Sequence, residues 1–274
     1  NVARELSQPG ILDWFRAVMD GAATDGPPNG GDPDTQFANA SRADSTEAAA
    51  PSGDTQSEPP DPSSGGELEV LEQDFWTARR QHQVIFESAL EKMTAPWAVF
   101  ACCVARVLAL VPPSITLPPI IGGKGSLNWF CAIVGKSGGG KGAAGNVAEN
   151  LVPDYVNERS IGSGEGMIEC YNRTPGKGDN PPPPVVSVMF MLTEIDTLGA
   201  MNSRSGQTTM TVLRSGFSGE KLGHSYRGRQ NETVASHTYR MTLVAMVQPS
   251  RAGALLDDSG GGTPQRFMWF PGMD

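Results

Sequence analysis

Residues 127–142 have the sequence LNWFCAIVGKSGGGKG. The first eight residues form an apolar run that is rich in aromatic and β-branched side chains and ends abruptly at glycine, which predicts a buried β-strand. Residues 135–142 fit the phosphate-loop pattern G-x-x-x-x-G-K, although glycine replaces the usual final serine or threonine. A strand, a glycine-rich loop and an alanine-rich helix start, in this order, predict an α/β nucleotide-binding domain.

The predicted phosphate loop offers two kinds of contact to an anion. Its glycines allow backbone N–H groups to curl around phosphate oxygens, and the following helix adds its positive N-terminus. We expect Lys141 to reach the β- and γ-phosphates of ATP, while Gly142 leaves Mg²⁺ to another ligand or to water. The alternative is a glycine-rich turn with two incidental lysines. The predicted nucleotide-binding residues are Gly135, Lys136, Ser137, Gly138, Gly139, Gly140, Lys141, Gly142 and Ala143.

A second apolar run, at residues 185–192, predicts another strand and closes in Thr193-Glu194-Ile195-Asp196. Carboxylates at the tip of a strand beside a phosphate loop can position Mg²⁺ and polarise an attacking water. We predict that Glu194 activates this water and that Glu194 and Asp196 are metal ligands. Thr193 occupies a position where many such enzymes have aspartate. The alternative is a surface turn with ordinary acidic residues.

Two further strand-like runs carry the remaining candidates for catalysis. The apolar run 241–247 is followed directly by Gln248, whose side-chain amide is placed to sense a γ-phosphate. The alternative is that Gln248 is only a turn residue. Arg266 follows a glycine-rich loop and precedes the apolar run 267–270, an arrangement that suits an arginine finger acting across a subunit boundary. The alternative is a structural arginine in a salt bridge. The predicted catalytic set is Lys141, Glu194, Gln248 and Arg266.

Basic side chains gather between residues 202 and 251, where seven arginines and lysines face two glutamates. Aromatic residues are interleaved with them, and this mixture can follow a phosphate backbone and stack on bases. A solvated surface would have a similar composition. The predicted nucleic-acid contacts are Arg214, Lys221, Tyr226, Arg227 and Arg229.

Charge and composition divide the 274-residue chain. Residues 1–66 hold 11 of the 30 acidic residues but three of the 21 basic ones, so most of the net charge of −9 lies there. We expect residues 1–20 to be a short helix or the end of an upstream domain, and residues 21–66, which have almost no large apolar side chains, to be a disordered acidic linker. A helical subdomain is predicted at 67–125, with Thr94 capping its second helix, and the nucleotide-binding core at 126–274.

The cysteines and the most apolar segment indicate where in the cell the protein is located. The four cysteines show neither a disulfide framework nor zinc-ligand spacing, so we expect a reducing, cytoplasmic setting. Residues 95–121 are interrupted by Arg106, Pro112 and Pro113, which predicts that they do not span a membrane.

Several strings resemble the helicase-like part of primase-helicase proteins from actinobacterial phages and prophages. They are APWAV at 95–99, LPPIIGG at 117–123, GGGKGAA at 138–144, QPSRAGALLDD at 248–258 and GTPQRF at 262–267. The resemblance implies a RecA-like P-loop NTPase core with a mostly parallel sheet. It also implies ATP and Mg²⁺ as cofactors, single-stranded DNA as a partner and a homo-oligomeric ring.

In this family an upstream primase-polymerase domain is often present, so we expect the chain to be a fragment whose flanking domains lie outside its 274 residues. The preferred interpretation is an ATP-hydrolysing replication motor, a helicase acting on single-stranded DNA. The first alternative is a non-motor nucleotide-binding module that loads or regulates a replication partner. A DNA-packaging or conjugation ATPase is a third hypothesis, since fold and nucleotide site alone do not specify translocation.

Overall fold

The computed structural model describes residues 65–119, 122–136, 138, 140–171, 185–196, 198, 207–223 and 233–272. The predicted helix at 1–20 and residues 21–64 of the predicted linker lie outside these ranges. The chain divides into two compact units, Asn1–Arg79 and Arg80–Asp274. In the first unit the structure describes helix α4 (Gly65–Thr77), which includes the last two residues of the predicted linker.

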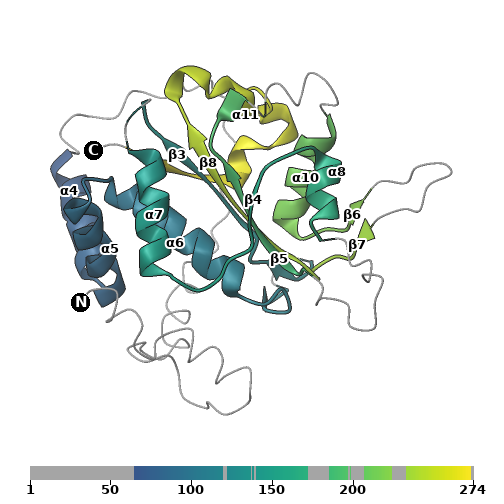
Figure 1. Cartoon of the computed structure of the whole chain (residues 1–274), viewed down its shortest axis with the longest axis horizontal. Helices are drawn as coiled ribbons and strands as arrows, with labels where there is room; N and C mark the ends of the chain where they lie inside the picture. Colours follow the sequence, from purple (N-terminus) through teal and green to yellow (C-terminus); the bar gives the residue numbers. More distant parts are fainter. Residues whose placement is uncertain are drawn as a thin grey trace, which may run out of the picture. The chain divides into compact units, whose positions relative to one another are not determined.

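The second unit is built on a five-stranded sheet in which all neighbouring strands are parallel (Figure 1). Its strands are β3 (Trp129–Val134), β4 (Glu158–Ser160), β5 (Ser187–Leu192), β8 (Arg240–Val247) and β9 (Phe267–Pro271). Their spatial order is β4-β5-β8-β3-β9. The predicted α/β class with a parallel sheet is therefore confirmed, and the apolar runs before Gly135, Thr193 and Gln248 are all strands.

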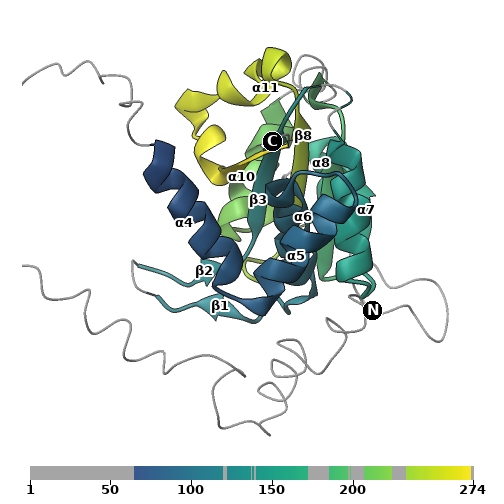
Figure 2. The same cartoon turned by 90° about the vertical axis from the view of Figure 1, so that its left-hand side faces the viewer.

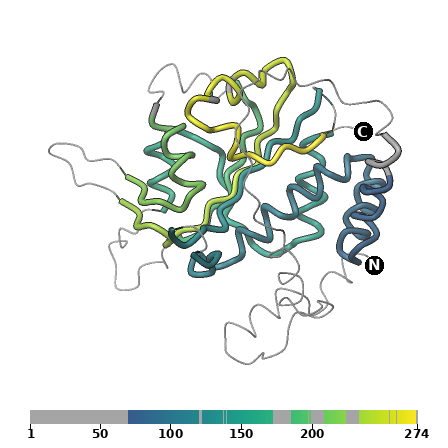
Figure 3. The backbone as a smooth tube through the Cα atoms, turned by 180° about the vertical axis from the view of Figure 1, so that it is seen from behind, coloured from purple at the N-terminus to yellow at the C-terminus, as the bar shows by residue number. Residues whose placement is uncertain are grey.

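Helices cover both faces of this sheet (Figures 1 and 2). One face carries α5 (Arg80–Glu91), α6 (Pro96–Leu110) and α7 (Lys141–Leu151), with α6 in contact with β3, β5 and β8. Figure 3 shows α6 running alongside the strands. The other face carries α8 (Gly164–Glu169) and α10 (Gln207–Ser218), which contact each other. All eight residues of the central strand β8 are buried, as expected for a strand covered on both faces.

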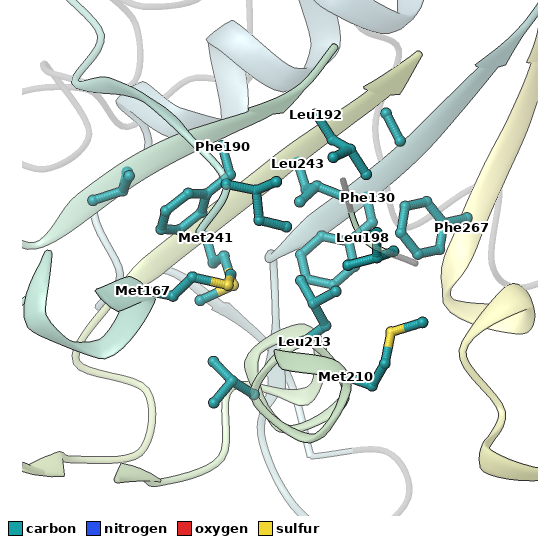
Figure 4. Close-up of a cluster of buried hydrophobic side chains, with 14 of the residues drawn as sticks. Phe130, Met167, Phe190, Leu192, Leu198, Met210, Leu213, Met241, Leu243 and Phe267 are labelled. Atoms are coloured by element: carbon teal, nitrogen blue, oxygen red, sulfur yellow. The ribbon is translucent and has the colours of Figure 1, made fainter. Parts of the chain in front are cut away.

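The main core lies between the sheet and the pair α8 and α10 (Figure 4). Leu213 and Met210 of α10 pack there with Phe130 of β3 and Leu243 of β8. Side chains alternate along a strand, so Cys131 lies on the opposite face from Phe130. The apolar side chains on one face of the strands thus meet those of α10 at one interface. Because a shift of one residue would move a strand's apolar side chains to the other face, this burial fixes the strand register.

The turn between α5 and α6 corrects one prediction. Thr94 does not cap the second helix, because the N-cap residue is Ala95 and makes no side-chain capping bond. Instead the Thr94 hydroxyl donates to the carbonyl oxygen of Ala89 at 3.2 Å, within the last turn of α5. Pro96 begins α6, where its missing N–H costs no intrahelical bond. The Thr94 side chain therefore stabilises the end of one helix, not the start of the next.

Arg240 corrects a second expectation. It is one of the seven basic residues counted in the stretch 202–251, yet it has 0% exposure at the start of β8. Its guanidinium donates to the carbonyl oxygens of Val111, Pro112 and Ile115 at 3.2, 2.9 and 2.9 Å. These bonds fasten the chain that leaves α6 to the amino-terminal edge of the sheet. Arg240 is therefore unavailable to a nucleic acid.

The remaining elements are short. They are β1 (Thr116–Leu117) paired with β2 (Gly125–Ser126), β6 (Leu222–Gly223) paired with β7 (Thr233–Val234), α11 (Gly253–Leu256), and the 3₁₀ turns η2 (Pro249–Arg251), η3 (Ser259–Gly261) and η4 (Pro264–Arg266). Within the described ranges, no helix has the length and apolar character needed to cross a membrane.

Candidate functional site

The carboxyl ends of β3, β5 and β8 lie at one edge of the sheet and bring three predicted segments together. Val134 pairs with Val247, and Leu192 pairs with Ala245, so the three strands end at nearly the same level. The N–H of Gly135 donates to the Val247 carbonyl oxygen at 3.0 Å. The chain leaves β3 toward distant β4 and later returns from β8 to β9 on the other side of β3. Ligands of open α/β sheets bind outside the carboxyl ends at such reversals.

The loop after β3 has the backbone that its glycines predict. Gly138 and Gly140 have φ values of +78° and +74°, in the left-handed region that favours glycine. Gly140 is the N-cap of α7, and its carbonyl oxygen accepts from the N–H groups of Ala143 and Ala144. The first N–H groups of a helix have no intrahelical acceptor, and the helix dipole is positive there. This end of α7 thus has the properties of an anion-binding site.

The Lys141 side chain folds back over this loop. Its Nζ donates to the carbonyl oxygens of Gly135 and Lys136 at 2.6 and 2.7 Å. Burial lowers the pKa of the Lys141 ammonium below its usual range. An ammonium group has three donors, and both described bonds go to neutral carbonyl groups. A phosphate at the same place would offer stronger, charge-assisted bonds.

Gly272 is a site residue that sequence reasoning missed. It follows β9, and its N–H donates to the carbonyl oxygen of Val134 at 2.7 Å. A β-carbon at this position would lie 2.9 Å from Cγ2 of Ile133 and 3.1 Å from Cγ of Lys141. Glycine is therefore required for close packing against the Lys141 side chain. The sequence signal for this role was a glycine two residues after the apolar run 267–270.

Glu194 and Asp196 differ in their surroundings although both follow β5. Glu194 is exposed beyond the end of the strand. Asp196 forms an ion pair with Arg251, and each side chain has 54% exposure. Because Arg251 follows β8, this pair joins the segments that leave two adjacent strands. Among the described residues no cluster of three His, Cys, Asp or Glu side chains is arranged to hold a metal ion, so the metal role of these carboxylates stays a prediction.

Gln248 lies at the same edge. It is half-buried directly after β8, and its carbonyl oxygen accepts from the Arg251 N–H at 2.9 Å. The bond from Gly135 to Val247 places the backbones of Gln248 and the phosphate loop next to each other. The fold thus brings this candidate to the loop, as a γ-phosphate sensor would require.

Arg266, in contrast, lies at the opposite edge. Phe267 pairs with Phe130 near the start of β3, while Pro271 pairs with Val134 at its end. At a rise of about 3.3 Å per residue, Arg266 is about 16 Å from the edge that carries its own phosphate loop. Its Nη1 donates to the Gly262 carbonyl oxygen at 2.6 Å, and its buried Nε has no hydrogen-bond partner among the residues that the structure describes. Within the described residues it has no carboxylate at ion-pair distance, unlike the salt-bridged alternative.

Comparison of the chain with protein-family models and with curated proteins finds no match. The resemblance to primase-helicase proteins therefore stays a prediction from the quoted strings.

The predicted nucleic-acid contacts are only partly described. Arg214 donates to Asp258 at 2.6 Å, and Asp258 also accepts from the Thr263 hydroxyl, so this guanidinium ties α10 to the segment before β9. Lys221 is exposed. Tyr226, Arg227 and Arg229 lie outside the described residues, as do Ser137 and Gly139 of the phosphate loop. Arg240 is buried, and Arg251 is paired with Asp196 although it is exposed, so these two residues are less available to a nucleic acid than the composition of the stretch indicates.

Proposed function

We propose that this chain is a P-loop nucleoside triphosphatase that binds the phosphates of ATP at residues 135–143. The observation that carries the proposal is the Lys141 ammonium, held over a left-handed glycine turn at the start of α7. This turn lies at the carboxyl edge of a parallel sheet, beside the strand-order reversal where ligands bind. The observed strand order is compatible with a RecA-like core, which is the finer fold we propose.

The residues at this edge fit a bound triphosphate. Phosphate oxygens would replace the carbonyls of Gly135 and Lys136 as acceptors for Lys141, because ammonium–phosphate bonds are charge-assisted. A β-carbon at Gly138 or Gly142 would meet no atom within 4 Å, so both positions border open space. The exposed Glu194 is available to orient an attacking water, and Gln248 to contact the γ-phosphate.

Mg²⁺ would neutralise developing negative charge on the phosphates during transfer. The chain lacks a hydroxyl at Gly142, so the side chains that we propose to contact such an ion are Glu194 and, once released from Arg251, Asp196. The other ligands would be phosphate oxygens and water, which Mg²⁺ readily accepts.

We further propose that the enzyme is a DNA motor, a helicase acting on single-stranded DNA as a homo-oligomeric ring. The family resemblance is the main support. The position of Arg266 adds to it, because the Arg266 backbone lies about 16 Å along β9 from the edge with its own phosphate loop, which suits an arginine that acts on another subunit's site. In this arrangement Lys221 and the basic residues near it would contact the DNA backbone.

Steady-state ATP hydrolysis with Mg²⁺, with and without single-stranded DNA, tests the proposal. We expect hydrolysis that DNA stimulates and that Lys141→Ala abolishes. Lys124→Ala is the matched control, since Lys124 is an exposed lysine of the β1–β2 turn outside the site. Mixing Lys141→Ala with Arg266→Ala protein should restore activity if the arginine acts between subunits. No recovery on mixing would remove the arginine finger from the proposal, while equal activity of Lys141→Ala and wild type would refute the ATPase.

The second candidate is a non-motor module that binds ATP and regulates a replication partner. It is favoured by Gly142 and Thr193, which stand where phosphate-loop enzymes usually have a hydroxyl and an aspartate for the metal ion. Tight ATP binding that depends on Lys141, without turnover in the presence of DNA, would support this candidate over the motor.

A further inference from the structure

Met93 has a backbone conformation that is unusual for its type. At the end of α5 the N–H of Met93 donates to Leu90 and the N–H of Thr94 donates to Ala89, at 3.0 and 2.9 Å. This bond pair is a Schellman motif, which places Met93 at the left-handed position after the helix, where glycine is usual. Its φ is +52°. A bulky residue with positive φ is an outlier, so the backbone does not account for a methionine here.

Packing does not account for it either. The Met93 side chain is 92% exposed, the largest exposure among the described large hydrophobic residues. Its neighbour Thr94 is buried and donates to Ala89, so the turn itself is held by other groups. Met93 thus combines a disfavoured backbone with an apolar side chain in solvent. Strained, exposed residues of this kind gather at ligand-binding sites.

The turn that carries Met93 lies against the phosphate loop. A β-carbon at Gly140 would lie 3.9 Å from the Met93 carbonyl oxygen. Gly140 precedes Lys141 and begins α7. If the nucleoside of a triphosphate bound in this loop lies on the side that this turn borders, the Met93 side chain is within reach of its base. The turn at residues 92–94 is thus the described segment that adjoins the loop at Gly140.

We infer that Met93 forms an apolar cover for the base of the nucleoside triphosphate bound at the phosphate loop, a role that rests on the proposed function. A thioether is polarisable and packs well against aromatic rings. The neighbouring side chains on the turn, Glu91 and Lys92, pair with each other at 3.1 Å. A contact through the base face is tolerant of base identity, since every base has a π-face. We therefore expect the Met93 contact itself to discriminate little between purine and pyrimidine triphosphates.

Binding of ATP and of inorganic tripolyphosphate, measured by calorimetry, separates the base contact from the phosphate contacts. Met93→Gly removes the side chain and suits the left-handed backbone, so it should fold with an unchanged or higher Tm. We expect it to weaken ATP binding by about fivefold or more, as loss of a base-stacking contact does, while tripolyphosphate affinity changes less than about twofold. Met93→Leu should retain ATP affinity because it keeps the apolar cover.

Tyr155→Ala is the matched control, because Tyr155 is also strongly exposed but lies beyond the far end of α7. Unchanged ATP affinity in Met93→Gly, or an equal loss for ATP and tripolyphosphate, would overturn the base contact while leaving the phosphate loop intact. If wild-type protein binds neither ligand, or binds both regardless of Lys141, the proposed function itself fails and this inference fails with it.

Discussion

The N–H of Gly272 donates a 2.7 Å hydrogen bond to the carbonyl oxygen of Val134, the last residue of β3. This bond joins the end of the edge strand β9 to the strand that leads into the phosphate loop. The Lys141 side chain lies in the same contact, since its Cγ is 3.1 Å from where a Gly272 β-carbon would be. The position of the catalytic candidate thus depends on a glycine 131 residues further along the chain.

Gly272→Ala should weaken both the fold and the site. The added methyl group meets Ile133 at 2.9 Å and the Val134 carbonyl oxygen at 3.1 Å, so β9 or the Lys141 side chain must shift. Overpacking of this kind costs about 1–3 kcal/mol of unfolding free energy, which chemical denaturation measures. We also expect weaker tripolyphosphate binding. Gly162→Ala, where a β-carbon meets nothing within 4 Å, is the control, and equal behaviour of the two variants would contradict the packing role.

Gly142→Ser should strengthen Mg²⁺-dependent nucleotide binding. A β-carbon at Gly142 meets no atom within 4 Å, so the hydroxyl that phosphate loops normally carry can be added without a clash. The expected result is a several-fold gain in affinity for ATP with Mg²⁺ and little change with EDTA, measured by calorimetry. Gly145→Ser, one turn along α7 and equally open, controls for general helix stabilisation. A gain that is the same with and without Mg²⁺ would argue against a metal contact.

Arg240→Met should destabilise the protein without affecting a surface function. Methionine keeps much of the length but removes the donors to Val111, Pro112 and Ile115, which leaves their carbonyl oxygens without these partners. The expected loss is about 3 kcal/mol in the free energy of unfolding, measured by urea denaturation. Arg159→Met in the exposed strand β4 should change it by less than about 0.5 kcal/mol. A stable Arg240→Met protein would show that the anchor is dispensable.

Thiol labelling tests how α6 covers the sheet. All four cysteines are free, and burial raises the pKa of Cys102 to about 12 and raises the pKa of Cys131 well above its usual range. Because the thiolate is the reactive form, these two thiols should resist iodoacetamide at pH 8. The half-buried Cys170 should be modified first, as peptide mass spectrometry would show. Rapid labelling of Cys131 in the native protein would contradict the coverage of the sheet by α6. In denaturant all four cysteines should be labelled.

Most of the sheet was predictable because its signals are local. The apolar runs before Gly135, Thr193 and Gln248 each ended where a strand ends, and Gly138 and Gly140 of the loop adopt the positive φ that only glycine accepts easily. The predicted cap at Thr94 was wrong because a hydroxyl between two helices has two backbone partners within reach. Sequence spacing cannot distinguish the carbonyl groups of the preceding helix from the N–H groups of the next.

The contacts that define the candidate site were less predictable, because each depends on which strands pair. In the sequence Arg240 resembles a surface cation. In the fold it is buried, because the chain that leaves α6 packs over it. Asp196 and Arg251 are 55 residues apart and meet only because β5 and β8 are neighbours. Arg266 precedes a strand in the sequence, but only the parallel register places it at the edge away from Lys141.

By itself the sequence determined the α/β class, the glycine-rich turn and the helix that follows it, since hydrophobic period and glycine conformation are local properties. Tertiary structure alone decided the order β4-β5-β8-β3-β9 and, with it, which side chains share the edge with Lys141. The physical reason is that strand order follows from which apolar faces of the sheet and helices bury one another. That choice depends on the packing of the whole chain and is not encoded in any one segment.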